Sequence, residues 1–156
     1  LRAGGYTAAV LAQSLERDAV APASNRPLAE EILAADGALI SEHPLGAITN
    51  RFEFARRDRI QSGLSRIVLP IQTGLKGGTQ NTISAAKRQS RPLWVPRVNQ
   101  EPGHEKWEGI AALLADGAAR GFTEAEYPEL VAAASLPIDP LPTPVSEVEP
   151  PPTLGL

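Results

Sequence analysis

Short apolar runs alternate with segments of helical periodicity over most of this 156-residue chain. The apolar runs predict buried strands at residues 6–12, 38–40, 66–71 and 92–95. The helical pattern predicts one helix from Arg26 to a stop at Gly37, capped by Ser24 or Asn25, and three more at residues 54–64, 79–89 and 105–114. Strands joined through helices at this spacing pair in parallel. The predicted fold class is therefore α/β, with a mostly parallel sheet and helices on both faces.

The composition changes sharply at about Leu136. Seven of the last twenty residues are proline, and such a stretch cannot bury a hydrophobic core. We therefore predict one folded domain over residues 1–135 and a flexible, disordered, Pro-rich tail over residues 136–156. The total length also favours a single domain.

Several classes of protein are disfavoured by what the sequence lacks. It has no cysteine and only two histidines, His43 and His104, so we expect no disulfide, no metal site and no cofactor. No apolar run approaches the ~18 residues that span a bilayer, and no signal segment opens the chain, so we expect a cytoplasmic protein. Because the sequence contains no methionine and starts at Leu1, we expect an N-terminally truncated piece of a longer protein.

Positive charge is concentrated in residues 51–97. This segment holds ten basic and two acidic residues, whereas the whole chain has a formal net charge of −3. A basic block that contains Gly-rich turns and a helix start is typical of an anion-binding surface. Nucleic acid is the leading candidate for the anion.

A glycine-rich loop inside the basic block, residues 74–79, lies between a predicted strand and a predicted helix. Gly77 and Gly78 let the backbone approach a ligand closely, and the helix that follows offers unpaired N–H groups. Lys76 adds a full charge, and the Thr79 hydroxyl can reach a phosphate oxygen. The alternative is an ordinary turn in which Thr79 caps the helix. The loop matches neither the Walker A pattern nor the Gly-x-Gly-x-x-Gly pattern.

Three arginines on the preceding predicted helix form a second candidate for phosphate binding. Arg56, Arg57 and Arg59 are expected to point outward, while Phe54, Ile60 and Leu64 point inward. Arginine forks bind phosphate with two parallel hydrogen bonds, although a solvated helix face is the alternative. Because ligands bind where strand ends meet in a parallel sheet, we expect the arginines and the glycine-rich loop to converge. Phe52 and Phe54 either stack on bases or belong to the core.

The sequence contains no convincing catalytic arrangement. Asp36, Glu42 and Asp58 do not form an acid/base pair, and Ser62 and Ser65 lack a His–Asp partner pattern. We therefore predict no catalytic residues and no enzymatic activity.

Two long stretches carry a family resemblance. They read NRPLAEEILAADGALISEHPLG and FEFARRDRIQSGLSRIVLPIQTGLKGGTQNTISAAKRQSRPLWVP. Together they resemble the DNA-processing protein A (DprA/Smf) family. The resemblance implies an extended Rossmann-like fold, single-stranded DNA binding in a basic pocket and no known enzyme activity. It also implies self-association as a homodimer and loading of RecA recombinase during natural transformation.

The resemblance also assigns residues to the DNA pocket. Two family motifs place there Phe54, Arg57, Arg59, Gly63, Ser65, Lys76, Gly77, Gly78 and Thr79, to which the charge argument adds Arg56. The chain departs from the family pattern where residues 13–16 lack the usual glycines, where Asp58 replaces the commoner Asn, and where Arg97 follows Val-Pro. The family's upstream Gly-Ser-Arg-Gly segment is absent from the sequence.

Other Rossmann-like proteins remain as alternatives. Phosphoribohydrolases that release cytokinin bases use a similar loop, followed by a glutamate early in the helix. Here residues 80–83 contain no carboxylate, which disfavours hydrolysis. A nucleotide-binding or nucleotide-sensing module of the same fold is the other alternative.

Overall fold

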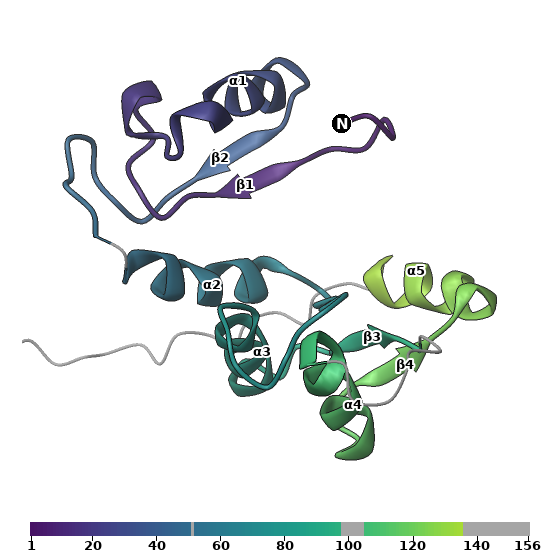
Figure 1. Cartoon of the computed structure of the whole chain (residues 1–156). Helices are drawn as coiled ribbons and strands as arrows, with labels where there is room; N and C mark the ends of the chain where they lie inside the picture. The colour runs from purple at the N-terminus through teal and green to yellow at the C-terminus, as the bar shows by residue number, and fades with distance from the viewer. Residues whose placement is uncertain (51, 98–104, 136–156) are drawn as a thin grey trace, which may run out of the picture.

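The structure is a computed structural model that describes residues 1–50, 52–97 and 105–135. Its strands are β1 (Ala8–Val10), β2 (Ala38–Ile40), β3 (Trp94–Pro96) and β4 (Arg120–Phe122). Its α-helices are α1 (Arg26–Ala34), α2 (Glu53–Leu64), α3 (Thr79–Arg88), α4 (Glu108–Ala115) and α5 (Tyr127–Ser135), as Figure 1 shows. Short 3-10 helices precede α1, α4 and α5.

All strand pairs in the described part of the chain are parallel. β1 pairs with β2, with Ala8 opposite Ala38, and β3 pairs with β4, with Trp94 opposite Arg120. Together with the alternation of strands and helices, this pairing confirms the α/β fold class. β2 has the predicted bounds, whereas β1 and β3 are shorter than predicted, and the strands form two separate ladders.

The predicted strand at residues 66–71 is reduced to a single bridge between Val68 and Leu93. Pro70 follows closely and has no N–H to donate to a ladder, and the side chains of Leu69 and Ile71 are exposed. Without a buried face or a continuous row of donors, the segment leaves the ladder after Val68.

Helices cover both faces of the β1–β2 ladder. α1 packs on one face and α2 runs along the other side of β1 (Figure 1). The side chain of Arg57 on α2 joins these layers, since its Nη1 donates a hydrogen bond of 2.6 Å to the carbonyl oxygen of Val10. Asn25 is the N-cap residue of α1, as predicted, and a proline occupies the first helical turn, but the Asn25 side chain makes no capping hydrogen bond.

The main hydrophobic core lies between α3, β3 and α4. It consists of small and branched aliphatic side chains from Ile83, Ala86, Leu93, Val95, Ile110 and Leu113. Ala86 and Val95 are completely buried. Trp94 is also buried, and the guanidinium of Arg120 lies 4.4 Å from the centre of its ring. Both α3 and the strand that follows it are therefore fixed by apolar packing.

The predicted inward face of α2 is wrong in part, because Ile60 is half-buried as expected but Arg57, expected to point outward, is half-buried as well. Phe54 and Leu64 are 47% and 58% exposed, whereas Ser62 is buried against α3, where its hydroxyl contacts the side chain of Gln89. The arginines of α2 are paired with neighbouring carboxylates and carbonyl oxygens. The helix can therefore pack its polar side against the rest of the fold without burying an unpaired charge.

The sequence did not predict β4 or α5. The 3-10 turn before α5 carries a capping box between Thr123 and Glu126, and the hydrogen bonds from Thr123 lower the pKa of the Glu126 carboxyl. Among the described helices, none is long and apolar enough to cross a membrane. The predicted tail at residues 136–156 lies outside the described residues, so the predicted domain boundary stays a prediction.

We predict that Ile83→Ala lowers the free energy of unfolding by about 2–5 kcal/mol, because it leaves a cavity in the main core. The side chain of Ile83 is only 2% exposed. The same substitution at Ile48, which is fully exposed, should change stability by less than about 0.5 kcal/mol. Urea denaturation of the two variants measures the difference, and equal effects would contradict this account of the core.

Candidate functional site: two adjoining hollows

One hollow lies between α2, the segment after the Val68 bridge, and the start of α3. We call it the α2–α3 hollow, and its volume is about 510 Å³. Phe54, Arg57 and Asp58 line it from α2, and residues 68–70 line it from the following segment. The start of α3 contributes Gly78, Thr79, Asn81 and Thr82.

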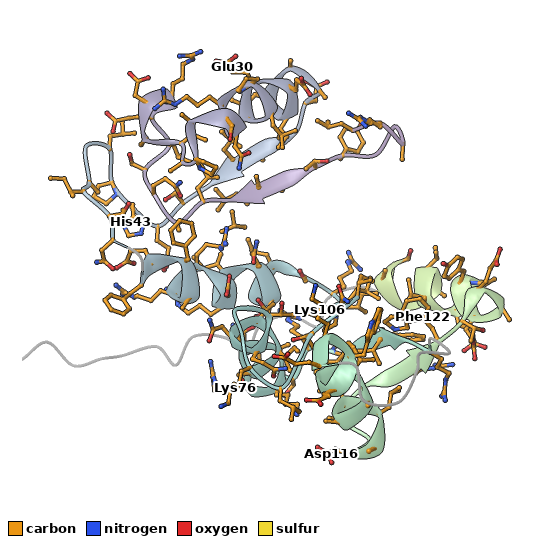
Figure 2. All side chains as sticks on the ribbon, viewed as in Figure 1. Glu30, His43, Lys76, Lys106, Asp116 and Phe122 are labelled. Carbon is orange, nitrogen blue, oxygen red and sulfur yellow. The ribbon has the colours of Figure 1, made fainter. Side chains whose placement is uncertain are left out.

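A second hollow of about 280 Å³ adjoins the first at Thr79, which lines both. We call it the lysine hollow, because Lys76 and Lys106 line it from two different segments. Its other lining residues are Gln72, Thr73, Gly74 and Gly77, so no carboxylate is among them. Lys76 is exposed and has no ion-pair partner in the described part of the chain, and Figure 2 shows it at the loop before α3.

The loop between the hollows is fixed by contacts from α3 and α4. Gln80 Nε2 donates a 2.7 Å hydrogen bond to the carbonyl oxygen of Gly74, and the backbone N–H of Gly109 donates to the carbonyl oxygen of Thr73 at 3.0 Å. Gly77 has φ of +122°, a conformation that side chains other than glycine rarely adopt. The loop is therefore held in one shape before any ligand binds.

The start of α3 offers backbone donors to this region. Gly78 is the N-cap, and Thr79 is the first helical residue and makes no side-chain capping bond, so the predicted capping role of Thr79 is wrong. In the described residues, no backbone carbonyl accepts the N–H of Gly78 or Thr79. The first turn also carries no acidic side chain. The N-terminal end of α3 is thus favourable for an anion.

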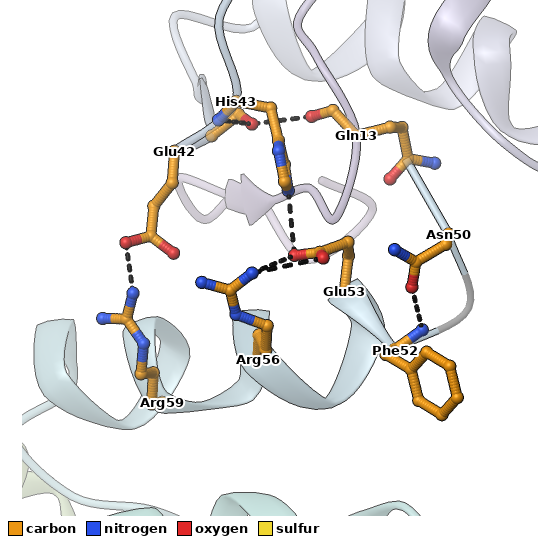
Figure 3. Close-up of polar contacts among 9 residues, drawn as sticks. Gln13, Glu42, His43, Asn50, Phe52, Glu53, Arg56 and Arg59 are labelled. Atoms are coloured by element: carbon orange, nitrogen blue, oxygen red, sulfur yellow. Dashed lines mark hydrogen bonds and ion pairs between the residues drawn. The ribbon is translucent and has the colours of Figure 1, made fainter. Parts of the chain in front are cut away.

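The three arginines of α2 are all paired with carboxylates. Arg56 lies 3.3 Å from Glu53, and Arg59 pairs with Glu42 from the segment after β2 (Figure 3). Arg57 Nε lies 3.2 Å from Oδ1 of Asp58. The predicted cluster is therefore not an uncompensated cationic surface, although the Arg56 and Arg59 side chains remain about half exposed or more.

The Glu53 carboxylate also binds a histidine. His43 Nε2 lies 3.4 Å from Glu53, which is therefore shared between His43 and Arg56 (Figure 3). Ser41 Oγ accepts from the backbone N–H of His43 and donates to the carbonyl oxygen of Gln13. These contacts connect the segment between β2 and α2 to α2 on one side and to the loop after β1 on the other.

The structure brings together some of the predicted site residues and separates the others. The α2–α3 hollow contains Phe54, Arg57, Gly78 and Thr79, and the lysine hollow contains Lys76, Gly77 and again Thr79. The remaining four, which line neither hollow, are Arg56, Arg59, Gly63 and Ser65.

Gly63 and Ser65 have structural contacts. The carbonyl oxygen of Gly63 accepts a 2.7 Å hydrogen bond from Arg91, and a side chain at this position would press on Gln89 of the α3 end. The hydroxyl of Ser65 donates to the carbonyl oxygen of Gln61 at 2.6 Å. That any of the predicted residues contacts DNA stays a prediction.

Sequence reasoning missed several residues of the two hollows. Asn81 and Thr82 could have been found, because they lie within one helical turn of Gly78 and Thr79. Asp58 was treated only as a departure from a motif, although it lines the α2–α3 hollow. Lys106 comes from a distant segment, and no local pattern points to it.

Comparison with known proteins gives the relationship directly. The family profile described as DNA recombination-mediator protein A matches residues 1–131. The chain belongs to this family. The resemblance to the DprA/Smf family that the sequence motifs indicated is thereby confirmed.

Two curated relatives are both called Protein Smf. The one from Synechocystis is 36% identical over 118 residues, which cover 76% of this chain and 28% of the relative. The one from Escherichia coli is 36% identical over 106 residues, which cover 67% of this chain and 28% of the relative. The chain thus spans little more than a quarter of the length of these relatives.

Two solved structures share the fold. DNA processing protein A from Helicobacter pylori, described for its single-stranded DNA binding mode, superposes with a TM-score of 0.68 at 27% identity, over 81% of this chain and 56% of that one. DNA processing protein A from Streptococcus pneumoniae superposes with a TM-score of 0.70 at 24% identity, over 86% of this chain and 45% of that one.

We predict that Gly109→Ala destabilises the loop that separates the hollows. A Cβ atom at this position would overlap the carbonyl oxygen of Gly74 and lie 2.8 Å from the carbonyl oxygen of Thr73, so backbone has to move. The free energy of unfolding should fall by about 1–3 kcal/mol, despite the higher helix propensity of alanine.

The matched control is Gly5→Ala, since no atom lies within 4 Å of a Cβ at Gly5. Its stability should match that of the unsubstituted chain. Urea denaturation of both variants gives the comparison. An unchanged or raised stability of Gly109→Ala would show that the loop is not packed against α4 as described.

Proposed function

We propose that this chain binds single-stranded DNA across the two adjoining hollows, without catalysis. The observation that carries the proposal is the lysine hollow, where two lysines and a glycine-rich loop meet next to the start of α3 and none of the described lining residues carries a carboxylate. Family membership supports the same function, as does similarity to a relative described for its single-stranded DNA binding mode.

The lysine hollow suits the phosphate backbone. Lys76 supplies a full positive charge, and the unpaired N–H groups of Gly78 and Thr79 supply directional donors at its edge. Each phosphate that a lysine neutralises releases counterions, so binding of this kind is strong at low salt and weak at high salt.

The α2–α3 hollow suits a base. The aromatic ring of Phe54, which is half exposed, lies beside apolar atoms from residues 68–70. Bases of single strands stack on such rings, and this contact tolerates any sequence. Because Thr79 lines both hollows, a base and a neighbouring phosphate can be bound side by side.

The arginines of α2 enter this proposal in two different ways. The pairs of Arg56 with Glu53 and of Arg59 with Glu42 involve exposed guanidinium groups, and exposed pairs are weak enough for a phosphate to compete with the carboxylate. Arg57 is held by Val10 and Asp58, so its first role is to position α2.

Wider roles belong to the proposal as well. The family resemblance extends it to DNA processing during natural transformation in the cytoplasm, with self-association as a homodimer and contact with RecA recombinase. The relatives are more than three times as long as the matched region.

We predict that Lys76→Ala weakens binding of oligo-dT about tenfold at low salt, because one phosphate contact is lost. The slope of log affinity against log salt concentration should become shallower by about 0.7, the value for one contact to a single strand. Fluorescence anisotropy at several salt concentrations measures both quantities.

Lys87→Ala is the matched control. Lys87 is exposed in the last turn of α3 and lines neither hollow, and its substitution changes the net charge equally. It should leave affinity and salt slope close to those of the unsubstituted chain. Absence of binding at low salt would reject the proposed function, and equal losses in the two variants would reject the lysine hollow as the phosphate site.

A further inference from the structure

We propose that Asp58 makes the α2–α3 hollow selective for guanine among the bases of a single strand. This inference rests on the proposed function, and it adds a specificity that neither the family nor the relatives assign. It starts from a carboxylate in an unexpected place, because an acidic side chain lines the hollow of a protein that is proposed to bind a polyanion.

The hollow has the lining of a base site. Its volume of about 510 Å³ lies within the range of ~300–1,000 Å³ that small-molecule sites occupy. Phe54, Leu69 and Pro70 offer apolar surface for the flat faces of a ring. The polar groups, on Asp58, Asn81 and Arg57, can meet the edge of the ring.

Asp58 is fixed and partly unpaired. Its side chain is only 13% exposed, and its Oδ1 accepts a hydrogen bond of 3.2 Å from Arg57 Nε. Arg57 is itself fixed by its bond to the carbonyl oxygen of Val10. In the described part of the chain, no donor is paired with Oδ2 of Asp58. The carboxylate therefore presents a free acceptor in a set orientation.

An acceptor-only group selects its ligand by the donors that the ligand brings. An ionised carboxylate can only accept hydrogen bonds, and it repels a phosphate that approaches the same place. Asp58 therefore disfavours the backbone in this hollow and favours a base with hydrogen-bond donors on its edge. The phosphate is left to the lysine hollow, which adjoins it at Thr79.

Guanine meets this requirement best. Its N1–H and its 2-amino group are adjacent donors that can both bind one carboxylate, while its O6 can accept from the amide of Asn81 or from Arg57, which line the same hollow. Thymine has a single N–H between two carbonyl oxygens. Cytosine and adenine each place an amino group next to a ring acceptor. Thymine, cytosine and adenine would each leave polar groups unpaired in this partly enclosed site. Because unpaired polar groups lower affinity, these three bases should bind more weakly than guanine.

The experiment compares oligonucleotides of equal length on the unsubstituted chain. The probes are oligo-dT and oligo-dT in which regularly spaced thymines are replaced by 7-deazaguanine, which keeps the donor edge of guanine but cannot form quadruplexes. A third probe carries hypoxanthine at the same positions, which keeps the N1–H of guanine but lacks its 2-amino group. We expect the 7-deazaguanine probe to bind about tenfold more tightly than oligo-dT, with the hypoxanthine probe between them.

Asp58→Asn tests the residue. Asparagine keeps an acceptor for Arg57 but also brings donors, so the variant should bind the three probes equally and should bind oligo-dT at least as tightly as the unsubstituted chain does. Circular dichroism establishes that the variant is folded. The control, Asp116→Asn, makes the same change at the end of α4, away from both hollows (Figure 2), and should keep the preference.

A measurement without variants complements these. dGMP should displace labelled oligo-dT at lower concentrations than dTMP, and equal displacement would count against a guanine site. If the unsubstituted chain binds all probes equally, or if Asp58→Asn raises every affinity by the same factor, the inference is overturned while the proposed function stands. If no probe binds at low salt, the proposed function itself has failed.

Discussion

The guanidinium of Arg57 joins helix α2 to the β1–β2 ladder. Its Nη1 donates to the carbonyl oxygen of Val10 at the end of β1, and its Nε donates to Asp58 on its own helix. A charged donor in a partly buried position makes a stronger hydrogen bond than a neutral one. Since each strand of the β1–β2 ladder has only three residues, the ladder has little surface of its own with which to fix α2. The bond from Arg57 to Val10 therefore helps to hold the β1–β2 ladder against α2.

Pairing of the arginines changes what the basic segment can do. Ten basic and two acidic residues over residues 51–97 suggest a strongly positive surface, yet each arginine of α2 has a carboxylate beside it. One of these carboxylates, Glu42, lies outside the segment. Charge counted along a sequence does not include partners that folding brings from elsewhere. The cationic character of the site moves to the loop before α3, where Lys76 has no carboxylate partner in the described residues.

All the described α-helices except α5 could be predicted from the sequence because their signals are local. The helix expected at residues 79–89 is observed as Thr79–Arg88, and the one expected at residues 54–64 as Glu53–Leu64. The strands depended on partners that periodicity does not reveal, so residues 6–12 pair only over Ala8–Val10. The predicted orientation of α2 was partly wrong because an apolar stripe was assumed to face inward. Instead, Arg57 donates a hydrogen bond to Val10 of β1, and ion pairs join α2 to the segment after β2. β4 was missed because Arg120–Phe122 has no run of apolar residues to mark a strand.

Only the part of the site that has a local sequence signal could be predicted. The glycine-rich loop could be found because Gly77 adopts a backbone conformation that excludes most other residues, and sequence motifs preserve such positions. The proposed acceptor role of Asp58 could not be predicted, because a carboxylate next to an arginine is equally consistent with a surface ion pair.

The position of Asp58 matters because electrostatic interactions near a protein surface are large at short range. Two like charges about 4 Å apart repel by about 4 kcal/mol at an effective dielectric constant of 20. Arg57 offsets part of this repulsion, but its charge is already shared with Asp58 and with the carbonyl oxygen of Val10. A phosphate is therefore expected to bind more favourably at Lys76, where none of the described lining residues carries a carboxylate. In the proposed mode of binding, the two hollows thus separate the tasks of nucleic-acid binding, with the charge of the backbone on one side of Thr79 and the edge of a base on the other.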